Sequence, residues 1–313
     1  MFVTLVELAM VILFILVLVD AARHFKTNRK KMLLLGLAFV YALIFENFNI
    51  ILSKGSVGGY FYNPEFLLYV WHMPLFVAAA WAALIYTAMH ISDVLELKTL
   101  TRPFMDAFLV LNIDLTLDVV ASRQKLWTWV GFTDLDGWFG IPADNFIGWL
   151  FVVFMFSFLF RYFSRSEDAM VNMTTRTEYY ILLPAFAYLA MLVLFSIVNF
   201  VEEIFHLTRS EELFLLWGMV ILFAAMIRTA KEKAHQIFEF DGYTLFIIFF
   251  TRLSFFIYIM WSLVLMKPHI GQIALGVILV ITMVAELLVY HSAFGHIGGN
   301  LKWFEKKKDF QHY

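Results

Sequence analysis

Residues 3–19 read VTLVELAMVILFILVLV, an apolar run that contains one charged side chain, Glu7. A helix that crosses a bilayer needs about 20 mostly apolar residues. The run is long for the core of a signal peptide, no basic residues precede it, and no small-residue cleavage site follows it. We therefore expect a retained transmembrane helix.

The composition of the whole chain extends this conclusion. Of 313 residues, 62% are hydrophobic and 15% are charged, and the mean hydropathy is +0.79. Soluble globular domains are about half apolar and about a quarter charged. The net charge of −2 gives no reason to expect a nucleic-acid partner, and the absence of cysteine excludes disulfides and thiolate metal sites. We predict an integral membrane protein whose surroundings are the lipid bilayer.

Nine stretches have the length and composition of spanning helices. They are residues 3–20, 32–52, 68–91, 104–121, 143–161, 179–201, 213–228, 242–266 and 271–291. The fourth is the weakest, because four polar residues fall inside it, Asp106, Asn112, Asp114 and Asp118. Connections are short and no internal repeat is visible, so we expect one all-α domain over residues 1–313. It is a polytopic bundle of about nine helices with a basic tail at 292–313.

The basic residues predict the orientation of this bundle. With nine spans, 17 of the 23 Lys and Arg residues fall on one side of the membrane and five on the other, while Arg252 lies inside a span. Because cytoplasmic loops are enriched in Lys and Arg, the N-terminus is expected outside and the C-terminus in the cytoplasm. Arg252 and Glu286 lie inside the last two spans and are expected to form a structural ion pair.

Three acids are the candidate catalytic residues. Asp114 and Asp118 are four residues apart, so they share one face of a helix, and Glu46 lies at a similar expected depth. Ionised carboxyls inside a membrane are costly, which predicts that the two aspartates face the bundle interior and share a proton. A buried carboxylic acid is a suitable proton donor to a weak base. The alternative is a hydrogen-bond network that only joins helices.

Aromatic and amide residues surround these acids in the sequence. Two connections, 58–64 and 127–142, are rich in aromatic residues and glycine and are suited to cover a cavity. The candidate substrate-binding residues are Asn47, Tyr60, Tyr62, Trp71, His72, Trp127, Trp129, Asn145 and Trp149. For the tryptophans the alternative is an interfacial aromatic belt, and for His72 it is a structural hydrogen bond.

These residues carry a family resemblance. The matching pieces are Glu46-Asn47, Gly59-Tyr60-Phe61-Tyr62, Pro74, Trp81, Asp114-Leu115-x-x-Asp118, Trp127-Thr128-Trp129 and residues 137–149, GWFGIPADNFIGW. In this order and spacing, the region 39–160 resembles membrane carotenoid-biosynthesis proteins that include bisanhydrobacterioruberin hydratases and related carotenoid 1,2-hydratases. The sequence departs from the family pattern at Val119, where proline is usual.

The resemblance implies a hydratase that adds water to a terminal isoprenoid double bond of an acyclic carotenoid. Such a reaction requires no cofactor and no metal. It implies Asp114 or Asp118 as the proton donor, and the other aspartate or Glu46 as the base that activates water. Other enzymes of the carotenoid pathway are implied as partners, and the cell membrane as the location of this multi-pass protein.

Two other functions fit parts of the pattern. Asn112-x-Asp114-x-x-x-Asp118 resembles the aspartate motif of intramembrane prenyltransferases, although a second such motif and nearby basic residues are missing. A lipid-binding or transport protein would use the acids as a proton relay, but would be expected to show repeat symmetry.

Overall fold

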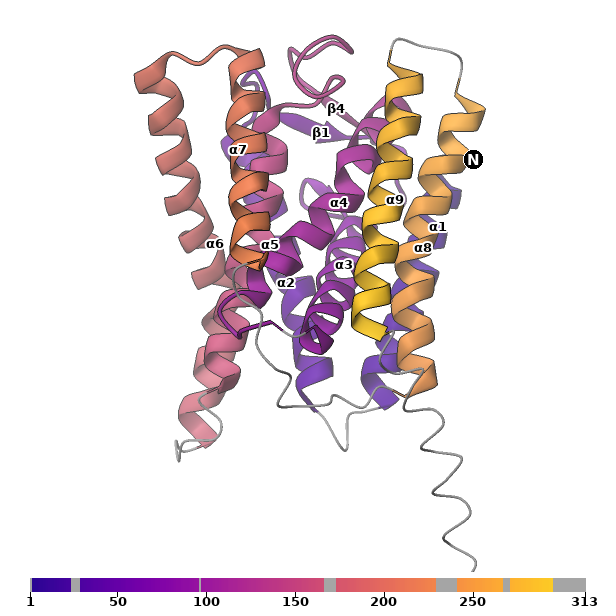
Figure 1. Ribbon diagram of the computed structural model, residues 1–313, viewed down its shortest axis with the longest axis vertical. Coiled ribbons are helices and arrows are strands. Elements are labelled where there is room, and N and C mark those ends of the chain that lie inside the picture. The colour runs from indigo at the N-terminus through magenta and orange to yellow at the C-terminus, as the bar shows by residue number, and fades with distance from the viewer. Residues whose placement is uncertain are drawn as a thin grey trace, which may run out of the picture.

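The computed structural model describes residues 2–23, 29–95, 97–165, 173–228, 241–266 and 271–294, with the side chains of 165 and 173–179 excepted. These residues form nine helices (Figure 1). They are α1 (Phe2–Arg23), α2 (Arg29–Leu52), α3 (Leu75–Val94), α4 (Arg102–Arg123), α5 (Ala143–Arg165), α6 (Met173–Phe205), α7 (Arg209–Arg228), α8 (Gly242–Leu265) and α9 (Gln272–Phe294). All except α4 are long and apolar enough to cross a membrane. The predicted polytopic helical bundle is confirmed. Nearly all of the tail predicted at 292–313 lies outside the described residues.

Four short strands lie at one end of the bundle, which we call the loop face (Figure 1). They are β1 (Tyr60–Tyr62), β2 (Tyr69–Val70), β3 (Met73–Pro74) and β4 (Trp127–Trp129). β1 pairs antiparallel with β4, and β2 pairs antiparallel with β3. The two aromatic connections identified in the sequence therefore join each other through backbone hydrogen bonds.

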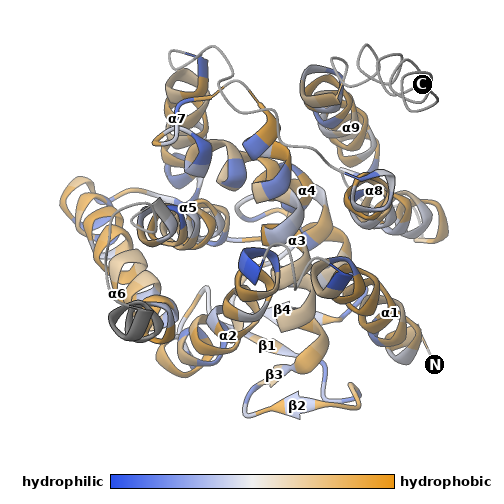
Figure 2. Cartoon of the chain, turned by 90° about the horizontal axis from the view of Figure 1, so that it is seen from below, coloured by the Kyte–Doolittle hydropathy of each residue, from blue (hydrophilic) through white to orange (hydrophobic). Residues whose placement is uncertain are grey.

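The two most buried helices are α3 and α4, which the other helices surround (Figure 2). Nearly every residue of α4 is buried, including Asp106, Asn112, Asp114 and Asp118. A helix that contacts protein on all sides needs no apolar surface toward lipid, so α4 can carry polar residues that a lipid-facing helix excludes. This explains why its sequence is the weakest span.

The prediction for the third span is wrong at its beginning. Residues 68–74 were expected to be helical, but α3 begins at Leu75 and the preceding residues form the β2–β3 hairpin. Pro74 disfavours the helical conformation of Met73, and Trp71 adopts a positive φ of 57° in the two-residue turn. Trp71 is 74% exposed at this turn. Trp71 and His72 therefore lie in a hairpin at the loop face.

Two buried side chains fasten this hairpin to the helices. Both oxygens of the Glu7 carboxylate accept backbone hydrogen bonds, from Leu67 N at 2.9 Å and from Leu68 N at 3.1 Å. Oδ1 of Asn47 accepts a hydrogen bond from the backbone N of His72 at 2.9 Å. No role was predicted for Glu7, and the structure shows that it satisfies backbone donors of a distant loop.

The predicted pair of Arg252 and Glu286 is confirmed and joins α8 to α9. Nη2 of Arg252 donates to Oε2 of Glu286 at 3.0 Å and to the Leu109 carbonyl of α4 at 2.7 Å. Asn112 adds a bond from Nδ2 to the same Glu286 oxygen at 3.2 Å and one to the Thr282 carbonyl at 2.9 Å. The hydrogen bonds of this buried charge pair therefore join three helices, α4, α8 and α9.

We expect Arg252→Leu to destabilise the folded protein by about 3–5 kcal/mol, because the Glu286 carboxylate would remain buried without its partner. The double variant Arg252→Leu/Glu286→Leu should recover most of that loss, since neither charge remains. Thermal unfolding of the purified variants in one detergent measures both effects. A double variant as unstable as Arg252→Leu would contradict a role limited to charge pairing.

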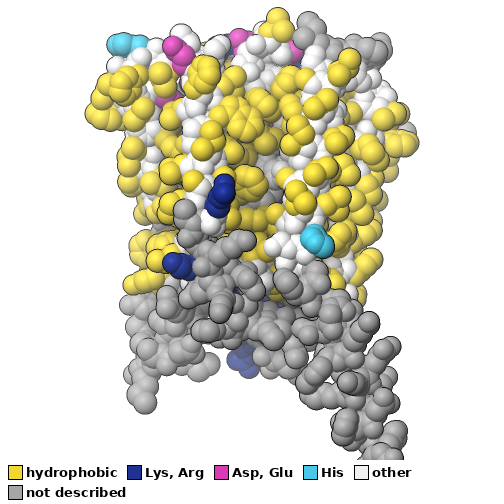
Figure 3. Space-filling model, viewed as in Figure 1, with side chains coloured by type: hydrophobic (Ala, Val, Ile, Leu, Met, Phe, Trp, Pro, Cys, Tyr) yellow, Lys and Arg dark blue, Asp and Glu magenta, His cyan; other side chains and the backbone are white. Residues whose placement is uncertain are grey.

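Charges divide between the two ends of the bundle. Lys54, Arg123, Lys125 and Arg209 lie at the loop face, and the other described Lys and Arg residues, except Arg252, lie toward the opposite end. Figure 3 shows Asp and Glu side chains at the loop face and hydrophobic side chains over the surface below it. The predicted separation of basic residues agrees with the helix directions, and the assignment of the loop face to the outside stays a prediction.

Candidate active site

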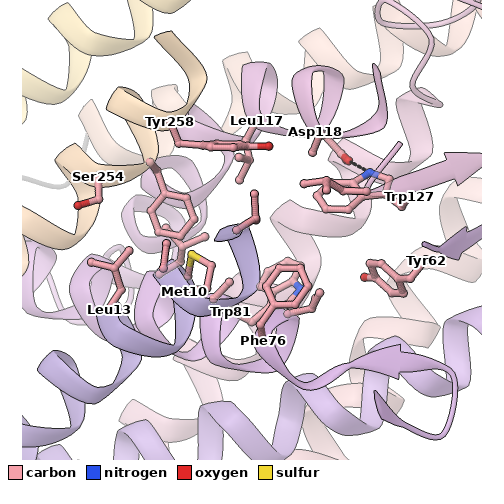
Figure 4. Close-up of a pocket in the computed structure, with 18 of the residues that line it drawn as sticks. Met10, Leu13, Tyr62, Phe76, Trp81, Leu117, Asp118, Trp127, Ser254 and Tyr258 are labelled. Carbon is pink, nitrogen blue, oxygen red and sulfur yellow. Dashed lines mark hydrogen bonds between the residues drawn. The ribbon is translucent and has the colours of Figure 1, made fainter. Parts of the chain in front are cut away.

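A cavity of about 370 Å³ lies in the half of the bundle next to the loop face. Its walls come from α1, α2, α3, α4, α5, α8 and from β1 and β4. Figure 4 shows Leu13 and Ser254 at one end of this cavity and Tyr62, Asp118 and Trp127 at the other. We call it the apolar cavity, because hydrophobic side chains form most of its lining.

Glu46 projects from α2 into the wall of the apolar cavity and accepts three hydrogen bonds. The hydroxyls of Tyr60 and Tyr62 donate to its Oε2 at 2.5 and 2.9 Å, and the indole N of Trp81 donates to its Oε1 at 2.7 Å. Two of the donors come from β1 and one comes from α3. Three donors around one carboxyl favour its ionised form.

Asp118 lines the same cavity from α4 and accepts two hydrogen bonds. The indole N of Trp127 donates to its Oδ1 at 2.5 Å, and Nδ2 of Asn145 donates to its Oδ2. Trp127 lies on β4 and Asn145 lies in the first turn of α5, so the carboxyl is held between a strand and a helix. Three of the predicted site residues therefore meet at this point.

Asp114 is in a different position from Asp118, although both lie on α4. Asp114 is buried, and neither of its carboxyl oxygens has a hydrogen-bond partner among the described residues. It lines neither of the two cavities described here. An unpaired carboxylate in such surroundings is costly, whereas the neutral acid is tolerated.

Aromatic rings form part of the cavity wall beside the acids. The ring centroids of Trp81 and Trp149 are 3.9 Å apart, and those of Tyr60 and Trp129 are 4.9 Å apart. Burial and the nearby Glu46 carboxyl raise the pKa of Tyr60 and that of Tyr62 well above the usual value. Both hydroxyls therefore stay protonated and remain donors to Glu46 over the physiological pH range.

One donor in this wall is free. The indole N–H of Trp129 is buried and has no hydrogen-bond partner among the described residues. Unsatisfied buried donors are uncommon and point to a ligand or a water molecule.

A second cavity of about 450 Å³ adjoins the first on its α2, α5 and α6 side. We call it the polar cavity, because its lining includes five polar side chains that are absent from the first. They are Asn49, Ser53, Asp144, Ser196 and Asn199. Glu46 and Asn145 line both cavities.

The first half of the stretch 137–149, which contributes to the family resemblance, forms a turn before α5. Gly137 adopts a φ of +52°, and a Cβ there would overlap the Ile141 carbonyl oxygen. The indole N of Trp138 donates to the Leu115 carbonyl of α4 at 2.8 Å. This turn positions the start of α5, where Asn145 contacts Asp118.

The structure brings most of the predicted site residues together. Seven of them line the apolar cavity in addition to Glu46, and they are Tyr60, Tyr62, Asp118, Trp127, Trp129, Asn145 and Trp149. Asn47, Trp71 and His72 belong to the hairpin attachment and line neither cavity. Trp81 was noted only as part of the resemblance, and Phe76 and Tyr258 gave no sequence signal because aromatic residues occur throughout these helices.

The fold and the site together define a class of protein. It is a polytopic membrane protein that encloses buried carboxyls and aromatic rings around an apolar cavity near the loop face of the helix bundle. The sequence profile of the carotenoid biosynthesis proteins matches residues 3–209, and the chain belongs to this family. The match extends beyond the region 39–160 on which the resemblance rested and includes α6. No curated protein and no solved structure gives a significant match.

Proposed function

We propose that this protein is a hydratase that adds water to a terminal isoprenoid double bond of an acyclic carotenoid, without a cofactor. The observation that carries the proposal is the position of two carboxyls, Asp118 and Glu46, in the wall of one aromatic-lined apolar cavity. Membership of the carotenoid biosynthesis family supports the substrate class.

The reaction requires an acid, a base and a shelter for a cation. The acid transfers its proton to the less substituted alkene carbon, and the π electrons form the new C–H bond. The resulting tertiary cation lies among aromatic faces, which stabilise positive charge. A water oxygen then forms a C–O bond with the cation, and the base takes the proton that this water loses. The sum is one alkene and one water giving one tertiary alcohol.

The hydrogen bonds and the cavity lining support one division of these roles. Glu46 accepts three hydrogen bonds, which favour its carboxylate form, so we assign it as the base. Asp118 accepts two hydrogen bonds instead of three and lines only the apolar cavity, so we assign it as the proton donor. Asp114 lies one helical turn from Asp118. Three neighbouring carboxyls are not all ionised together, so we assign Asp114 as a neutral acid beside Asp118 and as a positioning residue. After each turnover the proton held by Glu46 returns to Asp118.

The prenyltransferase alternative loses support from the position of Asn112. Its side chain donates to α9, at the Thr282 carbonyl and at Glu286, instead of lying with Asp118. The three residues of that motif therefore do not converge on one ligand. We also propose the cell membrane as the location and other carotenoid-pathway enzymes as partners, since the substrate remains in the bilayer.

The experiment is expression of the chain in bacteria that produce lycopene or bisanhydrobacterioruberin, followed by chromatography and mass spectrometry of the pigments. We expect a product that has gained one water molecule, with oxygen derived from isotope-labelled water. A matched strain with the double variant Asp118→Asn/Glu46→Gln is the control. Absence of any water-added product across several acyclic carotenoids, with the protein present in the membrane, would overturn the proposal.

A further inference from the structure

The two cavities are separated by one set of side chains. Six residues line both of them, and these are Glu46, Tyr60, Trp81, Trp129, Asn145 and Trp149. The closely stacked rings of Trp81 and Trp149 form the centre of this partition. Asp118, by contrast, lines only the apolar cavity.

The apolar cavity extends to the lipid-facing surface between α1 and α8. Its lining includes Ile12 of α1 and Phe250 of α8, which are 51% and 39% exposed. The two helices are joined toward the end opposite the loop face, where the Thr244 hydroxyl donates to Asp20 at 2.6 Å. Among the described lining residues of α1 and α8, all are apolar except Ser254 and Tyr258. Both hydroxyls already donate within the protein, Ser254 to the Phe250 carbonyl and Tyr258 to Gln124.

The polar cavity has the opposite character. It lies between α2, α5 and α6 beside the loop 53–59, and its polar residues lie toward the loop-face ends of these helices. The free indole N–H of Trp129 belongs to its wall as well. A cavity that offers several hydrogen-bonding groups holds water, whereas an apolar one of similar size stays dry.

We propose that the two reactants reach the site by separate routes. The end of the isoprenoid chain enters laterally from the bilayer between α1 and α8, and water enters through the polar cavity from the loop face. The identity of the lipid reactant rests on the proposed function, whereas the water route rests on the cavities themselves.

The separation has a chemical consequence. Glu46 reaches both cavities, so the base is in contact with water and with the cation. Asp118 reaches only the apolar cavity, so the acid is directed at the alkene and is shielded from bulk water. Trp129 N–H supplies a donor that holds the incoming water beside Glu46.

The absence of cysteine makes the routes testable by single cysteine substitutions in the full-length protein. Gly148→Cys places a thiol in the polar cavity, where an added Cβ meets only the Phe195 ring at 3.8 Å. Ser254→Cys places one in the opening between α1 and α8. Gly218→Cys is the matched control, because it lies on the exposed surface of α7 and its Cβ has no neighbour within 4 Å.

In reconstituted vesicles, a charged methanethiosulfonate reagent applied at the loop face should modify Gly148→Cys. It should modify Ser254→Cys and Gly218→Cys slower by about tenfold or more, because thiols react as thiolates and do not ionise in lipid. All three should react fully after denaturation in detergent. A nitroxide attached to Ser254→Cys should collide with dissolved oxygen, which concentrates in the bilayer, more often than with a water-soluble nickel complex.

Two results would overturn the inference. One is that the charged reagent modifies Gly148→Cys as slowly as it modifies Gly218→Cys, since the polar cavity would then be dry. The other is a Ser254→Cys nitroxide that meets the nickel complex as often as oxygen, since the opening would then be aqueous. Neither measurement requires turnover, so a failure of the hydratase proposal would appear in the pigment assay alone.

Discussion

Asp118→Asn is expected to reduce water addition to the carotenoid by about 10²–10⁴-fold, the usual contribution of a general acid. Asparagine has nearly the same shape, and its Oδ1 can still accept from the indole N of Trp127, which lies 2.5 Å from the aspartate oxygen. The amide carries no transferable acidic proton. The measurement is the fraction of pigment converted, divided by the amount of protein in the membrane.

Asp114→Asn is the matched comparison on the same helix. Asp114 has no hydrogen-bond partner among the described residues and lines neither cavity, so its substitution should reduce conversion far less. The protein level should be unchanged or higher, because an amide removes the risk of burying a charge. Full activity in both variants would refute the acid assignment, and a larger loss in Asp114→Asn would transfer the donor role to that residue.

The helical fold was largely predictable because the bilayer imposes a simple rule on lipid-facing helices. Eight spans follow from apolar length alone. The remaining helix, α4, could be predicted as a span only by accepting four polar residues within it. The interior position of this helix explains why they are present. The β2–β3 hairpin was not predictable from hydropathy, since Leu67 to Val70 are as apolar as a helix. Its backbone donors are satisfied by Glu7, 60 residues earlier in the chain.

The candidate site was predictable as a set of residues but not as a geometry. Spacing placed Asp114 and Asp118 on one helix face, about 40° apart. Asp114 also lies about 6 Å farther from the loop-face end of α4. Trp127 and Asn145, which lie near that end, donate to Asp118. The pairing of β1 with β4 is also invisible in the sequence, because more than 60 residues separate the two strands. The second cavity depends on α6 packing against α2 and α5, for which no motif exists.

Glu46→Gln is the second substitution with a large expected effect. The amide keeps an oxygen that accepts from the Trp81 indole N, now 2.7 Å from Oε1, and the hydroxyls of Tyr60 and Tyr62 can rotate to accept from its NH₂ group. The cavity should therefore persist, but the amide cannot take a proton from water. We expect conversion to fall by about 10²–10⁴-fold, as for removal of a general base.

Tyr62→Phe provides the control for Glu46→Gln, because it removes one of three donors and leaves the carboxylate in place. We expect a loss of about tenfold, smaller than that of Glu46→Gln, because one hydrogen bond to a charged group is worth about 1.5 kcal/mol at the lower end of its range. Burial raises the pKa of Tyr60 and that of Tyr62 well above the usual value, so both hydroxyls stay neutral as the pH rises toward 10. In washed membranes, the wild-type rate should therefore show no alkaline decline from these tyrosines, and Tyr62→Phe should match the wild type on the alkaline side of the pH profile. A Glu46→Gln variant with the activity of Tyr62→Phe would show that Glu46 only organises the donors around it and that another group accepts the proton.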